Sequence, residues 1–207
     1  RQMRFKTRLG PKAMATVSTD QSRPMWQSQG RRIYCVLSVM LLIIAAVVFT
    51  TPAAMARTYT AMVIDAETGD VLHEYRADHK VYPASLTKIM TLYMLFDALD
   101  SGKVSLSTRM EVSKRAWGQA PSKLGLQPGE KISVEDAILA LVTKSANDIA
   151  VVVAEHLGGT EVKFAQMMTA KARQIGMKNT TFRNASGLPN RGQLTTARDM
   201  IRLAVSL

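Results

Sequence analysis

The 207-residue sequence predicts an α/β (α+β) fold, in which a partial antiparallel sheet subdomain joins a larger helical subdomain. Three observations support this prediction. Two strand-like runs stand close together, five segments with helical periodicity follow them, and glycines or capping residues mark the ends of those segments. No internal repeat or low-complexity tract interrupts this order.

The two strands are expected over residues 59–64 and 71–75, which are rich in β-branched and aromatic residues. Between them, Glu67-Thr68-Gly69-Asp70 has the composition of a tight turn, because glycine adopts the positive φ that many such turns require. The pattern therefore predicts an antiparallel hairpin.

The helices are expected to begin and end at ordinary punctuation. Ser133 with Asp136, and Thr196 with Asp199, have the spacing of capping boxes and predict two helix starts. The mixed segment 113–129 is assigned no element. The helices are predicted over residues 85–99, 134–142, 148–156, 161–175 and 196–207.

The first 56 residues have the organisation of an export signal. Arg31-Arg32 precede an uncharged run over residues 33–56, which ends in Ala54-Met55-Ala56. This order predicts a signal peptide cleaved after Ala56, leaving 57–207 as a partial catalytic domain. The alternative is an uncleaved anchor, because 24 uncharged residues can span a bilayer. Both predict export, to the periplasm or the outer face of the cytoplasmic membrane.

The start of the chain and its charge belong to this signal. Met25 would give a compact signal peptide, so residues 1–24 are expected to be a long basic region or translated upstream sequence. Residues 1–32 hold +7 of the net charge of +11. The rest shows no basic stripe with interleaved aromatic residues, so no nucleic-acid partner is expected.

No cofactor or metal is predicted. Cys35 is the only cysteine and lies in the apolar part of the signal, so the exported part would have no thiol chemistry. The histidines His73, His79 and His156 lack the spacing of metal ligands. Any chemistry must come from other side chains.

The sequence Ser85-Leu86-Thr87-Lys88 at a predicted helix start has the elements of nucleophilic catalysis. Residues three apart on a helix lie on one face, one turn apart. A serine hydroxyl needs an adjacent base, and a lysine amine can serve if desolvation lowers its pKa. The helix N-terminus favours developing negative charge. The motif alone is a hypothesis, since most such pairs are solvated helix faces.

A second polar group, Ser145-Ala146-Asn147, lies between two predicted helices. Such a turn can present side chains into a cleft. The simpler interpretation is that Ser145 or Asn147 is an N-cap of the helix that follows, and both interpretations can hold together.

With these motifs the chain resembles the serine D-alanyl-D-alanine carboxypeptidases, low-molecular-mass penicillin-binding proteins with Ser-x-x-Lys and Ser-x-Asn elements. The resemblance runs from about Tyr59 to the C-terminus. It implies a DD-peptidase/β-lactamase-like transpeptidase fold, with the site between the two subdomains. Further matching segments are residues 64–69, 176–180, 184–189 and 196–200.

The resemblance implies a role for each motif residue. Ser85 would attack the D-alanyl-D-alanine peptide bond of a peptidoglycan stem peptide and form an acyl-enzyme, and Lys88 would accept its proton. Ser145 would pass a proton to the leaving D-alanine, and Asn147 would bind the substrate amide. The Ser85 amide would form half of the oxyanion hole. β-Lactams would act as inhibitors.

The family's third motif, Lys-Thr-Gly or a variant, is not in this sequence. We therefore expect a fragment, incomplete at its C-terminus, although a natural short paralogue that binds without turnover is the alternative. Loss of one oxyanion donor costs on the order of 100- to 1,000-fold in rate. Membrane association is possible through residues 33–56 or a missing C-terminal segment.

Three other activities are alternatives to a carboxypeptidase. A class A β-lactamase is disfavoured, because Ala146 replaces the usual Asp and no Glu-x-x-x-Asn follows Ser145. A DD-endopeptidase of the same family has the same chemistry. A non-catalytic protein that binds penicillin or D-Ala-D-Ala belongs to a different class, and acylation of Ser85 with release of product distinguishes it.

Overall fold

The computed structural model describes Tyr34, residues 37–42 and residues 59–207. The chain divides into two units, residues 1–56 and 57–207, which are described separately. Most of the predicted export signal, including its cleavage site at Ala56, lies outside the described residues. Within the described ranges, no helix is long and apolar enough to cross a bilayer.

The predicted hairpin is confirmed, and its first strand begins two residues later than expected. β1 (Ala61–Ile64) pairs antiparallel with β2 (Val71–Tyr75). The Asp65 carboxylate accepts two turn amides, each at 2.9 Å, which fixes the chain reversal. Every residue of β2 is exposed, so the hairpin contributes little to the core.

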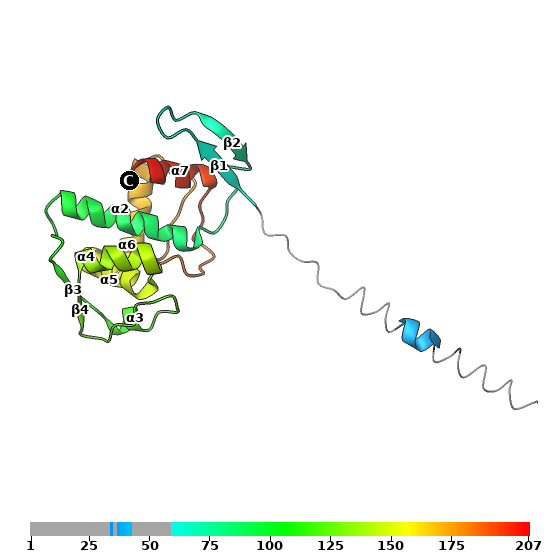
Figure 1. Ribbon diagram of the computed structural model, residues 1–207, viewed down its shortest axis with the longest axis horizontal. Coiled ribbons are helices and arrows are strands. Elements are labelled where there is room, and N and C mark those ends of the chain that lie inside the picture. Colours follow the sequence, from blue (N-terminus) through cyan, green and yellow to red (C-terminus); the bar gives the residue numbers. More distant parts are fainter. Residues whose placement is uncertain (1–33, 35–36, 43–58) are drawn as a thin grey trace, which may run out of the picture. The chain divides into compact units, whose positions relative to one another are not determined.

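The last helix, α7 (Ala197–Val205), lies beside β1 (Figure 1). Arg198 of α7 donates to Glu74 at 2.7 Å and to Asp78 at 2.9 Å. Its backbone amide also donates to the Ala77 carbonyl, at 3.1 Å. One arginine therefore ties the hairpin to the helical part.

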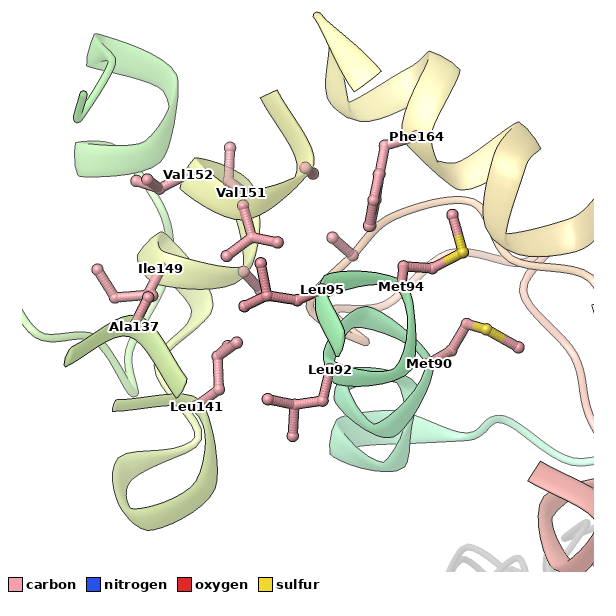
Figure 2. Packing of buried hydrophobic residues seen from close by; sticks show 14 of the residues in the cluster. Met90, Leu92, Met94, Leu95, Ala137, Leu141, Ile149, Val151, Val152 and Phe164 are labelled. Atoms are coloured by element: carbon pink, nitrogen blue, oxygen red, sulfur yellow. The ribbon is translucent and has the colours of Figure 1, made fainter. Parts of the chain in front are cut away.

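The core forms where α2 (Thr87–Asp100) packs on α5 (Asn147–Gly158), which in turn packs on α6 (Glu161–Gln174). Figure 2 shows Leu95 of α2 pointing toward the α5 side chains, with Phe164 of α6 closing the cluster. Residues 147–154 are all buried. A helix buried on every side supplies a rigid floor for the residues at its N-terminus.

Two short strands and a short helix lie where the sequence predicted no element. β3 (Arg109–Glu111) pairs antiparallel with β4 (Lys131–Ser133). Three-residue strands that carry charges give no readable alternation. The helix α3 (Lys114–Trp117) is capped by Ser113, whose hydroxyl accepts the Ala116 amide at 3.0 Å.

Two predicted helices are interrupted at places that bear on the site. The helix predicted over 85–99 begins as a 3₁₀ turn, η1 (Ala84–Leu86), before α2. The helix predicted over 134–142 is α4 (Val134–Leu139) followed by a π-helical turn, η2 (Ala140–Lys144). π-Helical turns frequently occur at functional sites.

The other helix predictions are close. α5 and α6 differ from the predicted ranges by one or two residues at an end, and α7 ends at Val205. The caps are confirmed: the Ser133 hydroxyl accepts the Asp136 amide, and the Thr196 hydroxyl accepts the Asp199 amide. From α6 to α7 the chain forms a returning segment, residues 181–195, which an isolated β-bridge between Thr181 and Leu194 closes on itself. A second bridge, between Thr195 and Val81, places its end beside the segment that precedes α2.

Candidate active site

Ser85 stands on a turn with an unusual backbone. It lies in η1, and the preceding Ala84 has a φ of +47°, in the left-handed region that non-glycine residues adopt at a cost of about 1–2 kcal/mol. Gly187 supports this turn from the returning segment. A Cβ at Gly187 would lie 1.9 Å from the Ala84 carbonyl oxygen, so only glycine permits the contact.

Lys88 lies in the first turn of α2 and is buried, with 3% of its surface exposed. Its Nζ donates to Asn147 Oδ1 and to the Ser186 carbonyl, both at 2.7 Å. Burial disfavours the charged amine and lowers the pKa of Lys88 from 10.5 to about 8. At pH 7 roughly a tenth of these amines are neutral, so a base is available at physiological pH.

Ser145 follows the π-helical turn η2 and is half-buried. Its φ of 53° and ψ of 43° lie in the left-handed region, which a non-glycine residue holds only where its surroundings impose it. The η2 turn and this kink together set the direction of the Ser145 side chain before α5 begins.

A cleft of about 620 Å³ brings Ser85, Lys88 and Ser145 together. The rest of its lining is apolar and includes Ile89 and Leu141. Three polar groups that converge in an apolar cleft are typical of a binding or catalytic site.

Asn147 is buried and is not among the residues that line this cleft, and both ends of its side chain are hydrogen-bonded inside the protein. Oδ1 accepts the Lys88 amine, and Nδ2 donates to the Ala120 carbonyl at 2.9 Å. The interpretation of Ser145 or Asn147 as an N-cap is wrong, because Ala146 is the N-cap of α5 and no side chain caps that helix. Asn147 instead accepts a hydrogen bond from the Lys88 amine.

Asp148 holds a loop at the edge of the site, and the sequence analysis assigned it no such role. It is fully buried, and its carboxylate accepts the amides of Leu124 at 3.0 Å and Gly125 at 2.8 Å. The same loop is held at Ser122, whose hydroxyl donates to the Lys144 carbonyl at 2.8 Å. The only sequence signal was an acidic residue in the first turn of a helix.

The Ser186 carbonyl was also missed as a member of the site. The segment 184–189 counted toward the family resemblance but received no role, because a main-chain acceptor leaves no residue-type signature. Asn184 shapes this segment: its Oδ1 accepts the Gly187 amide at 2.8 Å, and its Nδ2 donates to the Leu188 carbonyl at 2.9 Å.

The chain is similar in sequence to known peptidases. The D-alanyl-D-alanine carboxypeptidase DacC of Escherichia coli (strain K12) is 38% identical over 162 residues, which are 75% of this chain and 40% of that protein. A D-alanyl-D-alanine endopeptidase of Pseudomonas aeruginosa is 34% identical over 151 residues, 71% of this chain and 46% of that protein.

Solved structures show the same relationship. The D-alanyl-D-alanine carboxypeptidase DacD from Francisella tularensis superposes with a TM-score of 0.70 at 37% identity, covering 74% of this chain and 38% of that chain. Penicillin-binding protein D2 from Listeria monocytogenes in the ampicillin-bound form gives a TM-score of 0.64 at 30% identity, covering 74% and 63%.

The fold is therefore that of the penicillin-binding DD-peptidases, a helical subdomain with part of an antiparallel sheet subdomain. The sequence profile described as D-alanyl-D-alanine carboxypeptidase matches residues 47–207, and the chain belongs to this family, peptidase S11. The chain spans 38–40% of the length of the first curated relatives it matches.

Proposed function

We propose that this protein is a penicillin-sensitive serine DD-carboxypeptidase, which removes the terminal D-alanine from peptidoglycan stem pentapeptides through an acyl-enzyme on Ser85. One observation carries the proposal: a buried, desolvated Lys88 amine shares an apolar cleft with Ser85 and Ser145. The proposed activity is that of the whole protein, because the chain spans less than half of its carboxypeptidase relatives.

The hydrogen bonds of Lys88 suit a general base. A neutral amine has two hydrogens and one lone pair. Asn147 Oδ1 and the Ser186 carbonyl accept the two hydrogens, both at 2.7 Å, which leaves the lone pair for the Ser85 hydroxyl proton. The acceptors therefore orient the amine as well as bind it.

The proposed reaction then follows in order. Ser85 Oγ attacks the carbonyl carbon of the D-Ala-D-Ala bond as its proton moves to Lys88 Nζ. The C–N bond breaks, and the nitrogen of the leaving D-alanine receives a proton through the Ser145 hydroxyl. Water then attacks the ester and releases the shortened peptide. The backbone amide of Ser85 is proposed as one donor to the oxyanion.

The contacts of Asn147 modify the substrate-binding role that the resemblance implies for it. Its Oδ1 is occupied by Lys88 and its Nδ2 by the Ala120 carbonyl. A substrate amide would have to compete with one of these contacts or share an oxygen lone pair. We keep Asn147 as a substrate-binding candidate and propose that orienting Lys88 is its main task.

DD-endopeptidase activity is the second candidate. The Pseudomonas aeruginosa endopeptidase, 34% identical, supports it. The chemistry at Ser85 would be identical, with water as the final acyl acceptor, and only the leaving group would differ: free D-alanine in one case and the second peptide of a cross-link in the other. Separate assays with a pentapeptide and with a cross-linked dimer distinguish the two activities.

Residues 1–56 are proposed as an export signal, with cleavage after Ala56, and the mature protein is proposed to act outside the cytoplasmic membrane. The Ala-x-Ala sequence supports cleavage over an uncleaved anchor. The mass of the protein recovered from an exporting host tests this, since cleavage would leave Arg57 as the N-terminus.

The main proposal is tested by treating the chain with a fluorescent penicillin and measuring its intact mass. We expect a single covalent adduct, with the penicilloyl group on Ser85. This adduct should be absent from Ser85→Ala. An adduct that persists in Ser85→Ala would contradict the assigned nucleophile. Absence of any adduct in the wild-type chain would support a binding role or an incomplete site.

A further inference from the structure

Ala185 precedes Ser186, whose carbonyl accepts the Lys88 amine, and it is held by side chains of two helices. Thr91, three residues after Lys88, lies on the same face of α2. Its hydroxyl donates to the Ala185 carbonyl at 2.7 Å, while Lys88 donates to the Ser186 carbonyl at 2.7 Å. Two successive carbonyls of the returning segment thus bind two side chains of one helix face.

The backbone amide of Ala185, in the preceding peptide unit, is bound from α6. Glu161, the first residue of α6, is 3% exposed, and its Oε1 accepts the Ala185 amide at 3.2 Å. Its Oε2 accepts Arg115 Nε at 3.0 Å, and a second guanidinium nitrogen of Arg115 donates to the same oxygen. Both backbone polar groups of Ala185 are therefore satisfied by side chains.

These contacts reach Lys88 only through the main chain. Thr91 and Glu161 do not line the cleft that holds Ser85 and Ser145. The Ser186 carbonyl, however, is joined covalently to the Ala185 peptide that they hold. A shift of Ala185 would therefore move the oxygen that accepts the amine and would open the buried space around it to water.

We propose that Thr91 and Glu161 are positioning residues for Lys88, which fix the Ala185 peptide so that the Ser186 carbonyl stays against Nζ and water stays out. The effect on Ser85 acylation rests on the proposed function. The effect on the Lys88 amine does not, since it concerns the ground state of the protein.

The direction of the effect follows from the surroundings of the amine. Ser85, Ser145 and Asn147, which bind it or share its cleft, are uncharged. The Asp148 carboxylate accepts main-chain amides, and Glu161 accepts the Ala185 amide and the Arg115 guanidinium. Desolvation is what lowers the pKa of Lys88. Water admitted by release of Ala185 would solvate the ammonium form and raise this pKa.

The test compares Thr91→Val with a matched control, Thr180→Val. Both remove a buried hydroxyl at nearly constant shape. The hydroxyl of Thr180 bonds Asp199 and Thr195, each at 2.8 Å, and neither lines the cleft. Thr91→Ser restores the hydroxyl, and Glu161→Gln keeps an oxygen acceptor but removes the charge.

Two readouts separate this proposal from the proposed function. The first is the pKa of Lys88, followed by NMR of the whole chain labelled with ¹³C-lysine and assigned with Lys88→Arg. The second is the rate of penicillin acylation against pH. We expect Thr91→Val to raise the pKa by about one unit and to slow acylation at pH 7 by about tenfold, since each unit changes the neutral fraction tenfold.

Thr91→Ser should recover most of both changes, and Glu161→Gln should show a smaller rise in pKa. Thr180→Val should lower Tm yet leave the pKa and the acylation profile as in the wild type. An unchanged Lys88 pKa in both Thr91→Val and Glu161→Gln would overturn the proposal, as would an equal shift in Thr180→Val. A wild-type chain that does not acylate would count against the proposed function alone. The pKa of Lys88 measured by NMR would still test the positioning role of Thr91 and Glu161.

Discussion

The helical part and the hairpin of this protein are stabilised by different kinds of interaction. α5 is buried from residue 147 to 154 and packs against α2 and α6, whereas every residue of β2 is exposed. The hairpin is bound at the surface by Arg198, which pairs with Glu74 of β2 and with Asp78 just after it, and β1 lies against α7. A two-stranded hairpin alone is marginally stable, so the difference predicts a rigid site region and a weakly held sheet.

The largest effect is expected where the rigid region carries chemistry. Lys88→Arg should reduce the rate of Ser85 acylation by about 100- to 10,000-fold, because a guanidinium remains protonated and cannot accept the Ser85 proton. Stopped-flow measurement with a chromogenic β-lactam checks this. Acylation within a factor of three of the wild type would remove Lys88 from the role of base.

The second effect contrasts the two regions directly. Phe164→Ala removes a fully buried ring from the core beside α5 and should lower the free energy of unfolding by about 3–5 kcal/mol. Leu72→Ala on β2, where the side chain is exposed, should change it by less than about 0.5 kcal/mol. Denaturant titrations of the two variants measure both values. Similar losses in the two would mean that the hairpin belongs to the same cooperative core.

The third prediction concerns pH. Because burial lowers the pKa of Lys88 to about 8, the neutral amine increases as the pH rises toward that value. Acylation should therefore speed up about tenfold per pH unit below about 7.5 and level off above about 8.5. The rate measured from pH 5.5 to 10 gives the midpoint. A midpoint near the ordinary lysine value would show that the amine is solvated.

The smallest effect is expected at the link between the regions. Arg198→Ala should cost about 1 kcal/mol or less, since the partners Glu74 and Asp78 are largely exposed. Limited proteolysis should nevertheless cut the hairpin faster, because local opening needs fewer contacts to break. Acylation of Ser85 should stay as in the wild type. A loss of acylation would show that the hairpin transmits order to the cleft.

Much of the architecture could be predicted from local patterns. The turn at Asp65 and the caps at Ser133 and Thr196 reflect side chains that bond neighbouring amides, so their signal lies within a few residues. The three-residue strands β3 and β4 could not be predicted, because each is defined by pairing across about 20 residues of chain.

The residues of the candidate site also differ in how far the sequence could predict them. Ser85, Lys88 and Ser145 were found because their side chains form recognisable motifs, and the structure brings them to one cleft. The Ser186 carbonyl and the buried carboxylate of Asp148 act through tertiary contacts with distant segments. No spacing in the sequence encodes those contacts, nor the bonds of Asn147 to Lys88 and to the Ala120 carbonyl.

The π-helical turn η2 holds one residue more than an α-helical turn, because its hydrogen bonds run from residue i to i+5. Deleting the exposed Thr143 would let the stretch from Val134 to Lys144 wind as a continuous α-helix, while the residues after it kept nearly the same direction. Two homologous chains can therefore differ by a single gap inside this turn and still place the same motif residues at the cleft.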